Sequence, residues 1–148
     1  MHPQSRSELV EYLVKLRDFG NALSMLFMTV ATTSDGMVAG VVDGKLSLDY
    51  VRAGWLDFFR SKSFLNFCAK NRLTVDKVDW GRERVYRASL GKDIQGAADM
   101  VDRCFAEVFG HGGPFRIEFR PFGWTPTAQE SPEVGEVASS NNSLERPR

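Results

Sequence analysis

The clearest candidates for chemistry are Asp43 and Lys45, which flank Gly44 in the Asp-x-Lys spacing of many metal-dependent nucleases. In such sites, carboxylates bind Mg²⁺ and the lysine steadies the attacking water or the phosphate. Asp35 and Glu8 would supply further carboxylates. The chemistry requires the Asp and the Lys to lie in a strand and to point to one face. Asp43-Gly44 is better explained as a hairpin turn, so a Mg²⁺-dependent nuclease is kept as an alternative only.

Two groups of arginines raise a second alternative, the binding of single-stranded nucleic acid. Arg82, Arg84 and Arg87 surround one predicted hairpin, and Arg116 and Arg120 share one face of the last predicted strand. A basic sheet with aromatic rings holds single strands by charge and by stacking. However, acidic residues are interleaved with both groups, and 19 Lys and Arg residues balance 19 Asp and Glu residues. We therefore favour a solvated face of mixed charge over nucleic-acid binding.

Histidine and cysteine chemistry is sparse. His2 lies near the terminus, and His111 lies in a glycine-rich connector with no partner in the local sequence, which is typical of an exposed loop histidine. Cys68 and Cys104 occupy apolar positions of predicted helices, so we expect buried structural thiols. The cysteine spacing matches no metal motif, and we expect neither a metal nor a cofactor. With no export signal and no apolar stretch of membrane-spanning length, the expected location is the cytoplasm.

The elements that would position these residues follow an α+β pattern. Ser5 and Glu8 have capping-box spacing and predict a helix that starts at Ser5 and buries Leu9, Leu13 and Leu16. Later strands are predicted from the alternation of apolar and polar residues or from short apolar runs, later helices from apolar arcs, and the turns between elements from Asp-Gly pairs or glycines. These elements are strands at 22–31, 37–42 and 45–51 separated by Asp35-Gly36 and Asp43-Gly44, a helix at 55–71, strands at 73–80 and 82–90, a helix at 93–109, and a strand at Phe115–Phe119 that Pro121 ends. The order α-β-β-β-α-β-β-α-β predicts an antiparallel sheet packed with helices.

The composition changes after residue 124. Residues 125–148 contain proline, serine, asparagine and glutamate but no aromatic side chain. Such a segment cannot bury enough apolar area to offset the entropy of ordering. The sequence therefore predicts a single α+β domain at 1–124 and a disordered tail at 125–148.

The segment Trp55–Asn71 has aromatic side chains on more than one side of its predicted helix. Trp55, Phe58, Phe59 and Phe64 do not share one face at 100° per residue. Either a break at Ser61-Lys62-Ser63 turns the second half, or a partner covers a second apolar face. Exposed aromatic patches mark interaction sites, so these four residues form our candidate interface for a homodimer or a partner protein.

The order of elements, with the segment Asp99-Met-Val-Asp-Arg-Cys-Phe-Ala-Glu-Val-Phe-Gly110 followed by Pro114, resembles one superfamily. Its members are the type III secretion chaperone-like and YbjN-like proteins, and the resemblance extends over about residues 5–120. It implies an α-β-β-β-α-β-β-α core, to which this chain adds the strand Phe115–Phe119. It also implies a non-enzymatic, often homodimeric module that holds a peptide or partner protein against its sheet and helices. The expected function is therefore a chaperone-like or adaptor-like interaction module.

Overall fold

The computed structural model describes residues 1–52 and 57–124. Their element order is the predicted α-β-β-β-α-β-β-α-β, and the α+β class is confirmed. The elements are α1 (Pro3–Phe19), β1 (Met25–Val30), β2 (Gly36–Val42), β3 (Lys45–Arg52), α2 (Phe58–Lys70), β4 (Val75–Trp80), β5 (Glu83–Gly91), α3 (Ile94–Phe109) and β6 (Ile117–Phe122). The predicted tail at 125–148 and the candidate residue Trp55 lie outside the described residues.

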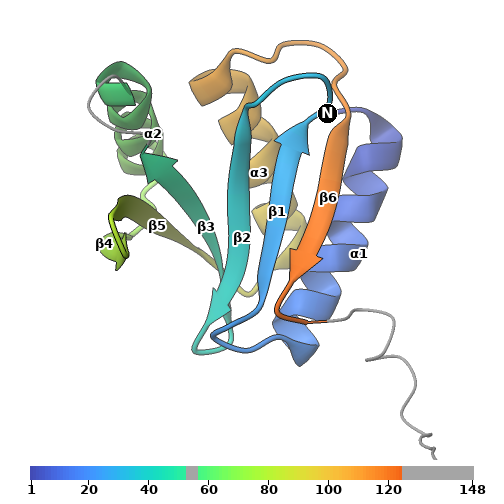
Figure 1. Ribbon diagram of the computed structural model, residues 1–148. Coiled ribbons are helices and arrows are strands. Elements are labelled where there is room, and N and C mark those ends of the chain that lie inside the picture. The colour runs from blue at the N-terminus through green and yellow to red at the C-terminus, as the bar shows by residue number, and fades with distance from the viewer. Residues whose placement is uncertain (53–56, 125–148) are drawn as a thin grey trace, which may run out of the picture.

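The strands form one antiparallel sheet in the order β4-β5-β3-β2-β1-β6. The helices lie on one face of this sheet, with α3 between α1 and α2 (Figure 1). Alternate residues of β1 (Leu26, Met28 and Val30) point into the core with residues of α1 and α3. No described helix covers the other face, which we call the open face of the sheet.

Helix α3 is the element that local sequence determines most completely. The Asp93 carboxylate accepts a hydrogen bond from the Gly96 N–H and caps the N-terminus. Gly110 ends the helix in the left-handed conformation, at φ 78°. Its predicted apolar arc is buried against the sheet and α1, at Ala97, Ala98, Val101, Cys104 and Phe105.

The predicted capping box of α1 is wrong. The helix begins at Pro3, and the His2 Nδ1 accepts a hydrogen bond from the Gln4 N–H. Ser5 lies inside the first turn, and its Oγ accepts a hydrogen bond from the Ile117 N–H at 3.0 Å. Proline suits the first helical position because the N–H it lacks would have no intrahelical partner there. The serine hydroxyl is thus used by β6 rather than by its own helix.

Of the two Asp-Gly pairs, only the second forms the predicted turn. Asp43 (φ 52°) and Gly44 (φ 77°) have the paired positive φ angles of a type I′ hairpin between β2 and β3. Between β1 and β2 the chain reverses earlier, through a loop that includes Thr32 at φ 67°. Gly36 instead begins β2, where a Cβ would lie 2.8 Å from the Met28 carbonyl oxygen. That glycine is required by a close backbone approach.

The bounds of the last strand need correction, and one of the two alternatives left open for the helix at 55–71 is excluded. The last strand occupies Ile117–Phe122 rather than Phe115–Phe119, and Pro121 lies within it, opposite Leu26 of β1. An edge strand such as β6 tolerates proline because it forms hydrogen bonds on one side only. Helix α2 runs from Phe58 to Lys70 without a break at Ser61-Lys62-Ser63. The orientation of its aromatic residues therefore follows from one continuous helix.

Candidate functional site

The residues of the nuclease hypothesis do not come together. Asp35 and Asp43 lie just beyond opposite ends of β2, about 25 Å apart at the rise of an extended strand. Lys45 begins β3 after the type I′ turn, and Glu8 is exposed on α1. Among residues 1–52 and 57–124, no group of three or more His, Cys, Asp or Glu side chains is arranged to hold a metal ion.

Asp35 instead belongs to a charged cluster that the sequence did not reveal. Its Oδ2 lies 2.8 Å from the His111 Nε2, and its Oδ1 accepts a hydrogen bond from the Arg60 Nη1 at 3.1 Å. The Arg60 guanidinium also lies over the Phe109 ring, 4.9 Å from its centroid. His111 is thus a half-buried, partnered side chain, and not the exposed loop histidine that was predicted. The cluster ties α2 and the α3–β6 connector to the loop before β2.

Tyr50 of β3 anchors the start of α2 in a second way. Its hydroxyl donates a hydrogen bond to the Asp57 Oδ2 at 2.6 Å, and its ring stacks on Phe64. Burial, and then the bond to Asp57, raise the pKa of Tyr50 well above its ordinary value. Phe64 is fully buried, so it belongs to the core and not to the surface interface in which the sequence placed it.

The remaining candidates, Phe58 and Phe59, lie at the surface on the first turn of α2. Their side chains are 50% and 81% exposed, and the two rings meet edge to face. Ser61, Phe64, Phe67 and Cys68 form the buried face of the same helix, at spacings of three and four residues. At 100° per residue, the two phenylalanines point more than 100° away from Phe64. We call these two residues the α2 aromatic pair.

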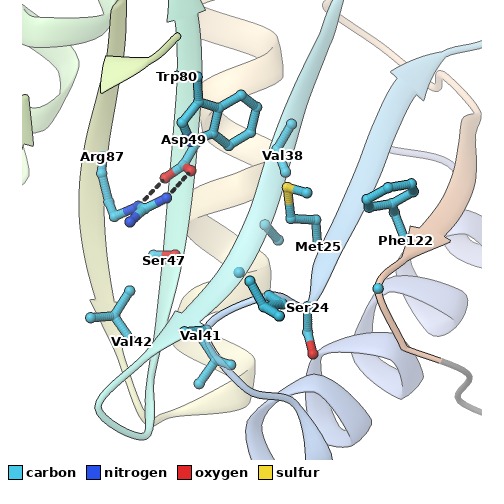
Figure 2. A pocket seen from close by; sticks show the side chains of 15 residues that line it. Ser24, Met25, Val38, Val41, Val42, Ser47, Asp49, Trp80, Arg87 and Phe122 are labelled. Carbon is cyan, nitrogen blue, oxygen red and sulfur yellow. Dashed lines mark hydrogen bonds and ion pairs between the residues drawn. The ribbon is translucent and has the colours of Figure 1, made fainter. Parts of the chain in front are cut away.

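The open face of the sheet carries a groove with a volume of about 540 Å³ (Figure 2). On one side of β2 lie Met25 and Phe122, and on the other lie Trp80 and the ion pair of Asp49 with Arg87. Apolar side chains make up most of the wall: Leu23, Met25, Val38, Val42, Trp80 and Phe122. Several of them, including Leu23, Val42 and Phe122, are exposed.

The hollow follows from one row of residues across the open face. Backbone pairing aligns Phe122, Met25, Gly40, Ser47 and Ser89 on successive strands. Gly40 lacks a side chain at the centre of this row, so the sheet surface is recessed there. A Cβ at Gly40 would lie 3.1 Å from the Ser47 Oγ and 3.6 Å from the Ser24 carbonyl oxygen. The Ser47 hydroxyl therefore lies directly beside the recess.

The adjacent row contains an ion pair between a buried carboxylate and a partly exposed arginine. The Arg87 Nε and Nη2 donate hydrogen bonds to the two carboxylate oxygens of Asp49 at 2.8 and 2.7 Å. Asp49 is 2% exposed, and the bond to its carboxylate raises the pKa of Arg87. A bidentate arginine-carboxylate pair satisfies both charges with fixed geometry. The polar part of the groove is thus electrically neutral.

The arginines of the nucleic-acid hypothesis do not form one basic surface. Arg84 points to the face of β5 opposite Arg87. Arg116 contacts Gln4 and His2 near the start of α1. Arg120 lies over the Phe27 ring, four strand positions across the sheet from Arg87.

The two cysteines are fully buried and free, as predicted. The Cys104 Sγ lies 3.5 Å from the Met37 Sδ. Burial raises the pKa of the Cys68 thiol to about 11 and raises that of Cys104 as well. Thiols with such pKa values are mostly protonated at neutral pH and are poor nucleophiles.

Within the described part of the chain, no helix has the length and apolar character needed to cross a membrane. The chain matches no family model, and no significant match to it was found among curated proteins or solved structures.

Proposed function

We propose that this protein is a non-enzymatic interaction module of the cytoplasm, which acts as a homodimer and binds a protein or peptide partner. The observation that carries the proposal is the α2 aromatic pair. Phe59 is 81% exposed in the monomer, and its ring meets the Phe58 ring edge to face. Contiguous aromatic surface of this kind marks contact sites, because burying it against a second protein removes it from water.

The surroundings of the pair support a fixed contact surface. Asp57 precedes the pair directly and is bonded to Tyr50, while the Ser61 hydroxyl donates to the Phe58 carbonyl oxygen at 3.0 Å. Arg60, in the same turn, is held by Asp35. A preorganised surface loses little conformational entropy when a partner binds.

Further support comes from the order of the first eight elements, α-β-β-β-α-β-β-α. This is the core order of the type III secretion chaperone-like and YbjN-like proteins that the sequence resembles. Membership of that superfamily would account for a dimeric module that holds a partner. The dispersed nuclease and arginine residues give the two alternative functions no comparable support.

The experiment compares the solution mass of three proteins by size-exclusion chromatography with light scattering. Wild type should be a dimer at micromolar concentration, whereas Phe59→Asp should be a folded monomer. The matched control is Phe19→Asp on α1, which removes an aromatic side chain that is also exposed, at 50%. This control should remain a dimer.

Circular dichroism should show the same helix content and similar thermal midpoints in all three proteins, because neither phenylalanine is buried in the monomer. A wild-type monomer at high concentration would refute the dimer. A dimer that survives Phe59→Asp but dissociates in Phe19→Asp would place the interface on α1 instead.

A further inference from the structure

The groove on the open face has features that a partner bound at the α2 aromatic pair does not explain. Its volume of about 540 Å³ lies within the range of about 300–1,000 Å³ that is typical of small-molecule sites. Such sites are mostly apolar, with a few placed polar groups that orient the ligand. The groove has this composition, with Met25 and Phe122 on one side of β2, Val38 on β2 itself, and a polar patch at Ser47 and Asp49 on the other side (Figure 2).

Gly40 is the first of these features, because a glycine at this position lowers the stability of the sheet. It lies inside β2, a strand that is paired on both sides, and it has no positive φ angle that would require glycine. Glycine in a strand interior weakens the strand, and it often marks a place where a ligand approaches the backbone closely. The recess at Gly40 lets a ligand lie against the sheet between Met25 and Ser47.

Ser47 is the second and independent feature. It is 3% exposed, and no described protein group forms a hydrogen bond with its Oγ. Buried hydroxyls are normally paired, because an unpaired one loses its bonds to water without replacement. Its hydroxyl lies beside the recess at Gly40, where it could donate a hydrogen bond to the polar atom of a bound molecule.

The charge of the groove restricts the head group of such a molecule. Asp49 and Arg87 neutralise each other through two short hydrogen bonds, so neither offers a free counter-charge. A charged head group would lose its hydration in the groove without gaining an opposite charge. A neutral hydroxyl or amide loses far less hydration and can satisfy Ser47.

From these observations we infer that the open-face groove binds a neutral amphiphile, with its apolar chain along Met25, Val38 and Phe122 and its hydrogen-bonding head at Ser47. This small-molecule site is distinct from the protein contact proposed for α2, and either could exist without the other.

The test uses the full chain and three eight-carbon probes, namely 1-octanol, octanoate and octylammonium, each kept below its aggregation limit. Two-dimensional NMR follows the amide signals of Gly40 and Ser47 during each titration. Octanol should shift both signals and bind at least about tenfold more tightly than either charged probe, a difference of about 1.4 kcal/mol.

Three variants locate the site. Gly40→Ala fills the recess and should weaken octanol binding by about tenfold or more. Ser47→Ala should weaken it about fivefold, while the thermal midpoint of the free protein stays the same or rises because an unpaired hydroxyl is removed. Ser89→Ala is the matched control, since Ser89 faces Ser47 across β3 and β5 but does not line the groove. It should leave binding unchanged.

If Gly40→Ala does not fold, the Ser47→Ala and Ser89→Ala pair decides alone. The inference is overturned if no probe shifts the Gly40 and Ser47 signals, or if a charged probe binds as tightly as octanol. It is also overturned if Ser47→Ala and Ser89→Ala bind octanol equally well. Octanol binding that converts a dimer to monomers would show instead that a second copy occupies the groove.

Discussion

Replacing Arg87 with alanine should destabilise the protein strongly, because it leaves the buried Asp49 carboxylate without its counter-charge. Asp49 is 2% exposed, and Arg87 satisfies both of its carboxylate oxygens at 2.8 and 2.7 Å. Removing one partner of a buried ion pair typically costs about 3–5 kcal/mol. A domain of this size is stable by about 5–15 kcal/mol, so Arg87→Ala would remove a large share of the total.

The double variant Asp49→Leu with Arg87→Met separates the two parts of this effect. Replacing both charges with apolar side chains of similar volume is often neutral or stabilising, since no buried charge is then left without a partner. We therefore expect the double variant to lie within about 1 kcal/mol of wild type. The ion pair would then contribute specificity to the groove more than net stability.

Urea denaturation followed by circular dichroism gives the free energies of unfolding. The matched control is Arg84→Ala, which removes an exposed arginine on the opposite face of the same strand and should change stability by less than about 0.5 kcal/mol. If Arg87→Ala costs no more than Arg84→Ala, Asp49 has another partner or reaches water. The description of the polar part of the groove as electrically neutral would then be wrong.

Three further predictions concern the turn between β2 and β3, the burial of the two cysteines, and the pKa of Tyr50. Gly44→Val should destabilise the protein by about 1–3 kcal/mol in thermal unfolding, because it forces a β-branched residue to φ 77°. Asp43→Asn should have almost no effect on stability. Metal-dependent nuclease activity that disappears in Asp43→Asn would restore the nuclease hypothesis. Cys68 and Cys104 should react with iodoacetamide at pH 7.5 only after unfolding, since both are buried and the pKa of Cys68 is raised to about 11; rapid alkylation of the native protein would contradict this. Because the pKa of Tyr50 is raised in the folded state, its contribution to stability is fully present below the ordinary tyrosine pKa of about 10 and is lost as the pH rises above that value. Above pH 10, the free energy of unfolding should therefore fall less steeply in Tyr50→Phe than in wild type.

The parts of the fold that the sequence predicted well depend on neighbouring residues. The glycine stop at Gly110 and the apolar arc that precedes it are contained in one helix. The Asp43-Gly44 turn likewise depends on two adjacent φ angles. Signals of this kind need no knowledge of the rest of the chain.

The errors arose where a distant partner determines the structure. Ser5 has the spacing of a helix cap, but its hydroxyl bonds to the Ile117 N–H on β6. Pro121 is accepted within a strand because β6 lies at the edge of the sheet, which the local sequence does not show. His111 gains its partner from Asp35, 76 positions earlier.

The candidate sites were predicted only in part. The aromatic content of α2 identified Phe58 and Phe59, but placing Phe64 in the core required knowing which helix face meets Tyr50. The groove was missed altogether, although two signals could have pointed to it. They are a glycine inside the apolar strand at 36–42, and an aspartate inside the apolar strand at 45–52.

The central claim, that the chain self-associates through the first turn of α2, is tested most directly by hydrogen-deuterium exchange at two protein concentrations. The first amides of a helix have no intrahelical acceptor and exchange quickly when exposed. Raising the concentration from below to above the dimer dissociation constant should slow exchange in peptides covering residues 58–64 and leave peptides of α1 unchanged. Equal exchange at residues 58–64 at both concentrations, in samples that light scattering shows to differ in mass, would contradict the account.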